Sequence, residues 1–95
     1  MSERRAFEWD DAKALNNLAK HKIEFEYGTN VFLDPRRVDL DASRTEDRET
    51  RRKIIGLIEG RLFTVVYTVR GRSTRIISAR RSNAMESKMY GSLHA

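Results

Sequence analysis

The chain contains no cysteine and only one proline among its 95 residues. Without cysteine, neither a disulfide framework nor a thiolate metal site can form, which fits a reducing compartment. No apolar stretch approaches the roughly 20 residues that a membrane-spanning helix needs. The basic N-terminus has no apolar run behind it, unlike a signal peptide. We therefore expect a cytoplasmic protein without a membrane segment.

Several classes of catalytic site also lack their usual residues. There is no glycine-rich phosphate loop and no Gly-x-Ser-x-Gly elbow. Asp39 and Asp41 alternate on one expected strand, but no third ligand for a cation lies near them, so we interpret both as solvent-facing. The sequence therefore predicts neither a metal nor a cofactor.

Charge is abundant and unevenly distributed. The chain carries 19 Lys and Arg against 14 Asp and Glu, a net charge of +5. Residues 1–50 hold nine basic and twelve acidic residues, whereas residues 51–95 hold ten basic and two acidic ones, so the halves carry −3 and +8. This asymmetry predicts a basic surface suited to nucleic acid or to an acidic protein. The alternative is that the charges only keep a small protein soluble.

Helical spacing of apolar residues predicts three helices. The first covers residues 10–22 and the second residues 24–32, where Gly28 weakens the pattern. The third covers residues 82–90, with Ser82 as its cap. Its sheet-facing side chains are expected to be Met85, Met89 and Tyr90.

Between the second and third helices the apolar pattern becomes that of β-strands. A polar loop over residues 42–50 and short turns at Gly60 and Gly71 separate four strands. These strands cover residues 36–41, 53–58, 62–69 and 73–80. Sequential strands with short turns favour an antiparallel meander, with 62–69 central because its apolar run is nearly continuous. We expect one α+β domain over residues 1–95, a four-stranded antiparallel sheet with two N-terminal helices and one C-terminal helix.

Two adjacent arginines, Arg80 and Arg81, end the last strand just before the final helix. Strict alternation places Arg75 and Arg81 on one face of the sheet and Arg80 on the other. A guanidinium group beside the free N–H groups of a helix N-terminus suits a phosphate. The alternative is an arginine that pairs with Glu59 or Asp10 at the sheet edge.

Three other side chains have both a functional and a structural interpretation. Trp9 and Tyr67 suit stacking on RNA bases, although a tryptophan beside a helix start is also a common core anchor. His21 suits proton transfer near neutral pH, or it is a cation that stabilises the end of the first helix. Glu59 is an alternative base. The residues alone leave these alternatives open.

Five blocks of sequence, followed by Glu86 and Tyr90, resemble the BrnT family from Phe7 to Tyr90. The blocks are FEWDDAK, NNLAKHKIEFE, VFLDP, KIIGLIEGRLFTVVYT and RIISARR. The resemblance implies a RelE-like ribonuclease fold and a type II toxin that cleaves RNA without a metal and inhibits translation. It also implies a BrnA-type antitoxin that covers the toxin. No recognition-helix pattern is present, so operator DNA is expected to be reached only through that antitoxin.

The resemblance also implies a set of site residues. The expected catalytic residues are Arg80, Arg81, His21 and Lys20, with the two arginines stabilising the phosphate of the transition state. The expected RNA-binding residues are Arg61, Arg75, Trp9 and Tyr67. The chain departs from the family at Gly28, expected to loosen the second helix, and in a last helix with few basic residues. The alternative function is a basic module that binds RNA, DNA or a partner without cutting.

Overall fold

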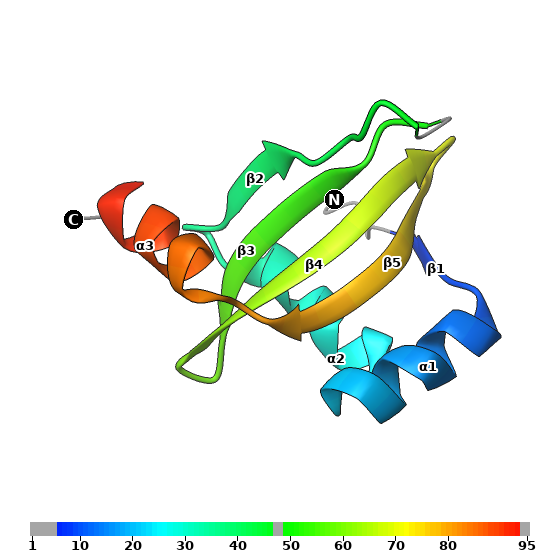
Figure 1. The fold of residues 1–95 in the computed structure, drawn as a ribbon, viewed down its shortest axis with the longest axis horizontal. Coiled ribbons are helices and arrows are strands. Elements are labelled where there is room, and N and C mark those ends of the chain that lie inside the picture. The colour runs from blue at the N-terminus through cyan, green and yellow to red at the C-terminus, as the bar shows by residue number, and fades with distance from the viewer. Residues whose placement is uncertain (1–5, 47–48, 94–95) are drawn as a thin grey trace, which may run out of the picture.

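A computed structural model describes residues 6–46 and 49–93, which form one mixed sheet with helices packed on it (Figure 1). The elements are β1 (Ala6–Glu8), α1 (Asp11–His21), α2 (Phe25–Gly28), the 3₁₀ helix η1 (Thr29–Leu33), β2 (Val38–Asp41), β3 (Arg52–Ile58), β4 (Arg61–Arg70), β5 (Ser73–Arg81) and α3 (Ala84–Leu93). Within these residues no helix is both long and apolar enough to span a membrane.

The predicted meander is confirmed, but the prediction of a four-stranded, wholly antiparallel sheet is wrong. The strand order is β1-β5-β4-β3-β2, with β4 in the centre. Each strand from β2 to β5 is antiparallel to the next strand along the chain. β1 adds a fifth strand, parallel to the start of β5, and Glu8 pairs there with Arg75 at 2.8 Å. Three residues are too few to show a strand period, so no pattern in the sequence identified β1.

The two hairpins follow from their turn residues. Glu59 and Gly60 have φ values of 50° and 81°, as the two-residue type I′ turn between β3 and β4 requires. Gly71, at φ 57°, opens the equally short turn between β4 and β5. These turns set the register that places Arg61 at the first position of β4, opposite Ile58.

The predicted face alternation along β5 is wrong because the strand contains a bulge. Val66 pairs with Ser78, but the next residue of β4, Tyr67, pairs with Ile76, so one residue of β5 is left over. As a result Ile76 and Ala79 both lie in the core. Arg75 therefore shares a face with Arg80, whereas Arg81 lies on the face that packs against α1 and α2.

The second predicted helix is shorter than expected. α2 has four residues and continues as η1, and together with α1 it covers one face of the sheet (Figure 1). Gly28, expected to loosen this segment, is buried, and a Cβ there would lie 3.0 Å from the Cβ of Ala79. The glycine therefore allows close contact between helix and sheet. The core beneath contains Phe25, Val31, Ile54, Val65 and Ile76.

Two predictions for the last helix are wrong. The side chain of Asn83, not Ser82, caps α3 by accepting a hydrogen bond from the N–H of Glu86 at 2.9 Å. Met85 is 74% exposed, and Glu86 is buried in its place. A carboxylate replaces the expected apolar contact because strands β3, β4 and β5 supply polar partners for it.

Candidate functional site

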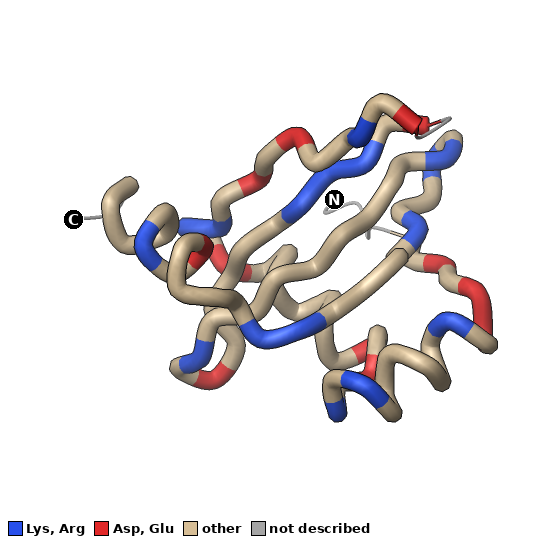
Figure 2. Tube along the Cα trace, in the orientation of Figure 1, with Lys and Arg blue, Asp and Glu red and all other residues tan. Residues whose placement is uncertain are grey.

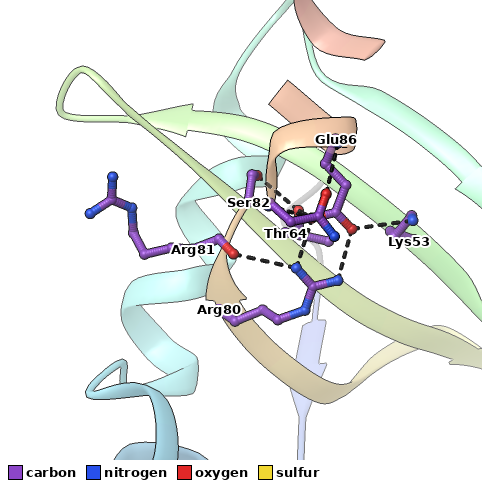
Figure 3. A network of polar contacts seen from close by, with 7 residues as sticks. Lys53, Thr64, Arg80, Arg81, Ser82 and Glu86 are labelled. Atoms are coloured by element: carbon purple, nitrogen blue, oxygen red, sulfur yellow. Dashed lines mark hydrogen bonds and ion pairs between the residues drawn. The ribbon is translucent and has the colours of Figure 1, made fainter. Parts of the chain in front are cut away.

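The adjacent arginines at the end of β5 point to opposite faces and have different surroundings. Arg80 forms two hydrogen bonds of 2.7 Å with the carboxylate of Glu86, from Nη1 to Oε1 and from Nη2 to Oε2. Glu86 is only 1% exposed, and the side chain of Arg80 is 29% exposed. Figure 3 shows Arg81 pointing away from this network. Arg80 thus forms an arginine–carboxylate pair, which was the alternative to a phosphate site. Its partner is Glu86 and not Glu59 or Asp10.

Three further groups complete the environment of the Glu86 carboxylate. Thr64 Oγ1 donates to Oε1 at 3.0 Å, the Asn83 N–H donates to the same oxygen at 2.9 Å, and Lys53 Nζ lies 3.2 Å from Oε2. Burial alone would raise the pKa of Glu86, but the hydrogen bonds from Arg80 and these groups outweigh it and lower the pKa to about 2. With Asn83, the carboxylate also completes a capping box. Glu86 therefore joins α3 to three strands.

Arg81 lies at an open pocket of about 520 Å³ on the other face of the sheet. Its guanidinium carbon is 5.5 Å from the ring centroid of Phe63, a cation–π contact. His21, Lys22 and Arg61 line the same pocket. Figure 2 shows the basic segments at the end of β5, at the β3–β4 turn and at the end of α1 on the same side of the molecule.

Local structure explains why these side chains meet. α1 ends at His21 because Lys22 adopts a left-handed conformation, φ 62°, and its N–H caps the helix on the Leu18 carbonyl. The β3–β4 turn places Arg61, the first residue of β4, at the pocket. Tyr27 of α2 packs edge-on against Phe63, with ring centroids 5.6 Å apart, and lines the pocket as well. The pocket thus combines cations with two aromatic rings.

Asn17 holds α1 against the free edge of β5, a contact that the sequence interpretation missed. Its amide nitrogen donates to the Ala79 carbonyl at 2.8 Å and to the Ile23 carbonyl at 3.0 Å, and its oxygen accepts from the Ala79 N–H at 3.1 Å. Asn17 thereby substitutes for a neighbouring strand. The available signal was its helical spacing with Ala14 and His21, which places a polar side chain on the inward stripe.

The structure brings together three of the predicted site residues, His21, Arg61 and Arg81, and separates the others. Lys20 lines a smaller hollow of about 240 Å³, and His21 lines both this hollow and the pocket. Trp9 packs edge-on against Phe25, and Arg75 pairs with Glu8.

Tyr67 is buried in the core, so its ring has no open face on which a base can stack. Its hydroxyl donates to Asp39. Burial, followed by this hydrogen bond, raises the pKa of Tyr67 to about 12. Tyr67 is therefore a structural side chain in this fold.

Comparison with known proteins identifies a family. The family model described as "Ribonuclease toxin, BrnT, of type II toxin-antitoxin system" matches residues 9–86, which span α1 to the first turn of α3 and include every residue of the pocket. No curated protein matches the chain.

Proposed function

The chain belongs to the BrnT family of ribonuclease toxins of type II toxin–antitoxin systems, and from this premise we propose that it cleaves RNA in the pocket at Arg81. The proposed cleavage reaction needs no metal ion. The toxin then inhibits translation in the cytoplasm, and a DNA-binding antitoxin of the BrnA type neutralises it. An antiparallel meander with α1 and α2 on one face supports a RelE-like fold.

One observation carries the proposal: His21, Arg61 and Arg81 are distant in sequence but line one open pocket. Metal-free cleavage requires a base for the 2′-hydroxyl, cations for the pentavalent phosphate and an acid for the leaving 5′-oxygen. His21 is the group suited to proton transfer. Arg61 and Arg81 are suited to the phosphate, since each guanidinium offers several donors at fixed angles.

Tyr27 is the aromatic side chain of the pocket that suits a base adjacent to the cleaved bond. Its ring is half-buried and meets Phe63 edge to face, whereas Phe63 itself is buried and covered by Arg81, so a flat base can stack on Tyr27. Lys20 lies in the neighbouring hollow, from which it would contact the RNA backbone. In this scheme Arg80 acts indirectly, because its bonds to Glu86 fix the end of β5 from which Arg81 projects.

The test is incubation of purified protein with a 5′-labelled RNA in EDTA. Wild type should shorten the RNA, whereas Arg81→Ala and His21→Ala should lose most of the activity while their Tm stays within a few degrees of that of wild type. Arg72→Ala is the matched control, because Arg72 is exposed in the turn beyond the far end of β4 and its loss changes the net charge equally. RNA that is shifted but never shortened would favour the binding module, and activity unaffected by Arg81→Ala would contradict this site.

A further inference from the structure

A second, chemically opposite groove lies beside the basic pocket. It has a volume of about 390 Å³ and is lined on its apolar side by Trp9, Ala14, Leu15, Leu18 and Phe25. Its charged lining consists of Asp11, Glu24 and Glu26, with no Lys or Arg. A chain with a net charge of +5 therefore presents a local acidic surface here. We refer to it as the acidic groove.

Two leucines of α1 in the apolar wall of the acidic groove are exposed, although Phe25 of the same wall is buried in the core. Leu15 is 68% exposed, and Leu18, one turn further along α1, also faces solvent. The inward side of α1 is held to β5 by Asn17, so Leu15 lies nearly opposite this contact around the helix, and Leu18 lies on the flank between the two. Apolar side chains grouped on a surface and edged by charges are typical of a protein-binding site.

The acidic groove is adjacent to the pocket that contains Arg81, which we call the basic pocket. Leu18 and Glu24 line both cavities, so they form the wall between them. A segment that fills the groove over this wall also reaches the pocket mouth and obstructs RNA. RNA itself is disfavoured in the groove, because three carboxylates repel its phosphates.

We propose that the acidic groove binds the antitoxin through an amphipathic helical segment with apolar side chains on one face and Lys or Arg beside them. The inference rests on the proposed function, which supplies the need for a neutralising partner. The apolar wall selects the helix face and the carboxylates select its charge, the usual division in helix-in-groove recognition. Neutralisation then follows from the shared wall, without contact to the pocket arginines.

Trp9 makes the groove directly observable, because it is the only tryptophan of the chain and lines this surface. The first experiment titrates the full-length protein with a tryptophan-free helical peptide of leucine and lysine. Trp9 emission should shift and saturate with this peptide, but not with a leucine–glutamate peptide of the same pattern or with short RNA. A shift produced equally by both peptides, by neither, or by RNA would overturn the proposal. So would a shift on raising the concentration of the protein alone, since a second copy would then be the occupant.

The second experiment separates the groove from a rival apolar surface. Leu15→Glu should weaken binding of the leucine–lysine peptide about tenfold or more, and Glu26→Lys should weaken it less. Leu33→Glu is the matched control, because Leu33 is 77% exposed and lines a different hollow, near Leu57. Loss of binding in Leu33→Glu with retention in Leu15→Glu would place the partner elsewhere and overturn the proposal.

Growth assays connect the groove to neutralisation. Cells that express the toxin with the antitoxin of its operon should grow, whereas cells with Leu15→Glu toxin and the same antitoxin should arrest. Leu15→Glu toxin that is fully neutralised would overturn the proposal. The peptide titration needs no nuclease activity, and the RNA assay needs no partner, so failure of the groove and failure of the proposed nuclease give different results.

Discussion

Replacing Arg80 by alanine removes both 2.7 Å hydrogen bonds from a carboxylate that is 1% exposed. Removal of one partner from a buried ion pair costs about 3–5 kcal/mol. Glu86 retains Lys53 at 3.2 Å and the Thr64 hydroxyl at 3.0 Å, so we expect about 2–3 kcal/mol for Arg80→Ala. For a domain of this size that loss lowers Tm by about 10–20 °C.

Arg81→Ala provides the contrast, because the substitution is the same and the two arginines are adjacent in the sequence. Arg81 is exposed and contacts Phe63, so its loss should cost about 0.5 kcal/mol and move Tm by a few degrees. Thermal melting by circular dichroism, with RNA cleavage measured well below both melting temperatures, checks the two expectations together. At that temperature Arg80→Ala should retain more cleavage than Arg81→Ala.

A wild-type Tm for Arg80→Ala would refute the reasoning, because the buried carboxylate would then not need its guanidinium. The double variant Arg80→Ala/Glu86→Gln tests the cause of the loss. A neutral amide has no buried charge to compensate, so the double variant should be more stable than the sum of the two single losses predicts. Simple additivity would show that the two side chains are not coupled.

Three other results are expected. Glu86 has a folded pKa of about 2, below its ordinary 4.5, so its contribution to stability is complete above about pH 4.5 and is lost as the pH falls towards 2. Urea unfolding of wild type and Glu86→Gln across this range should show the two stabilities converging at the acid end. Gly56→Ala should destabilise the fold by about 1–3 kcal/mol, because the new Cβ would lie 2.8 Å from the Val31 carbonyl oxygen, and urea midpoints measure this. Tyr67→Phe should cost about 1 kcal/mol by leaving the Asp39 carboxylate without this donor, and ultraviolet titration of wild type should show Tyr67 ionising only near pH 12.

Local sequence rules predicted the fold where a single segment carries the signal. The turns at Gly60 and Gly71 and the apolar run of residues 62–69 gave the correct antiparallel order with β4 in the centre. The same rules failed where the structure depends on contacts between segments that are distant in the sequence. β1 is three residues long and is defined by its partner β5, and the bulge at Ile77 arises from pairing with β4 and leaves no local mark.

The candidate site shows the same division. The family motifs indicated His21, Arg61 and Arg81, and the fold brings them to one pocket. The two sequence-adjacent arginines were assigned one shared role, because nothing local shows that a glutamate six residues later turns inward to Arg80. The side chains of the last helix expected to face the sheet were Met85, Met89 and Tyr90, and Glu86 was not among them. The donors that make burial of its charge favourable come from the three strands β3, β4 and β5 and from the backbone of Asn83.

The pairing of β1 and α1 with β5 has a consequence for synthesis of the chain. Glu8 meets Arg75 67 positions later, and Asn17 meets Ala79 62 positions later, so the first quarter of the protein has no sheet to dock on until the last strand has been made. Contacts of such long range slow folding and are formed late. On a translating ribosome, which releases the N-terminus first, the basic pocket therefore remains unassembled until β5 emerges. The order of synthesis thus delays the appearance of the proposed nuclease until the chain is nearly complete.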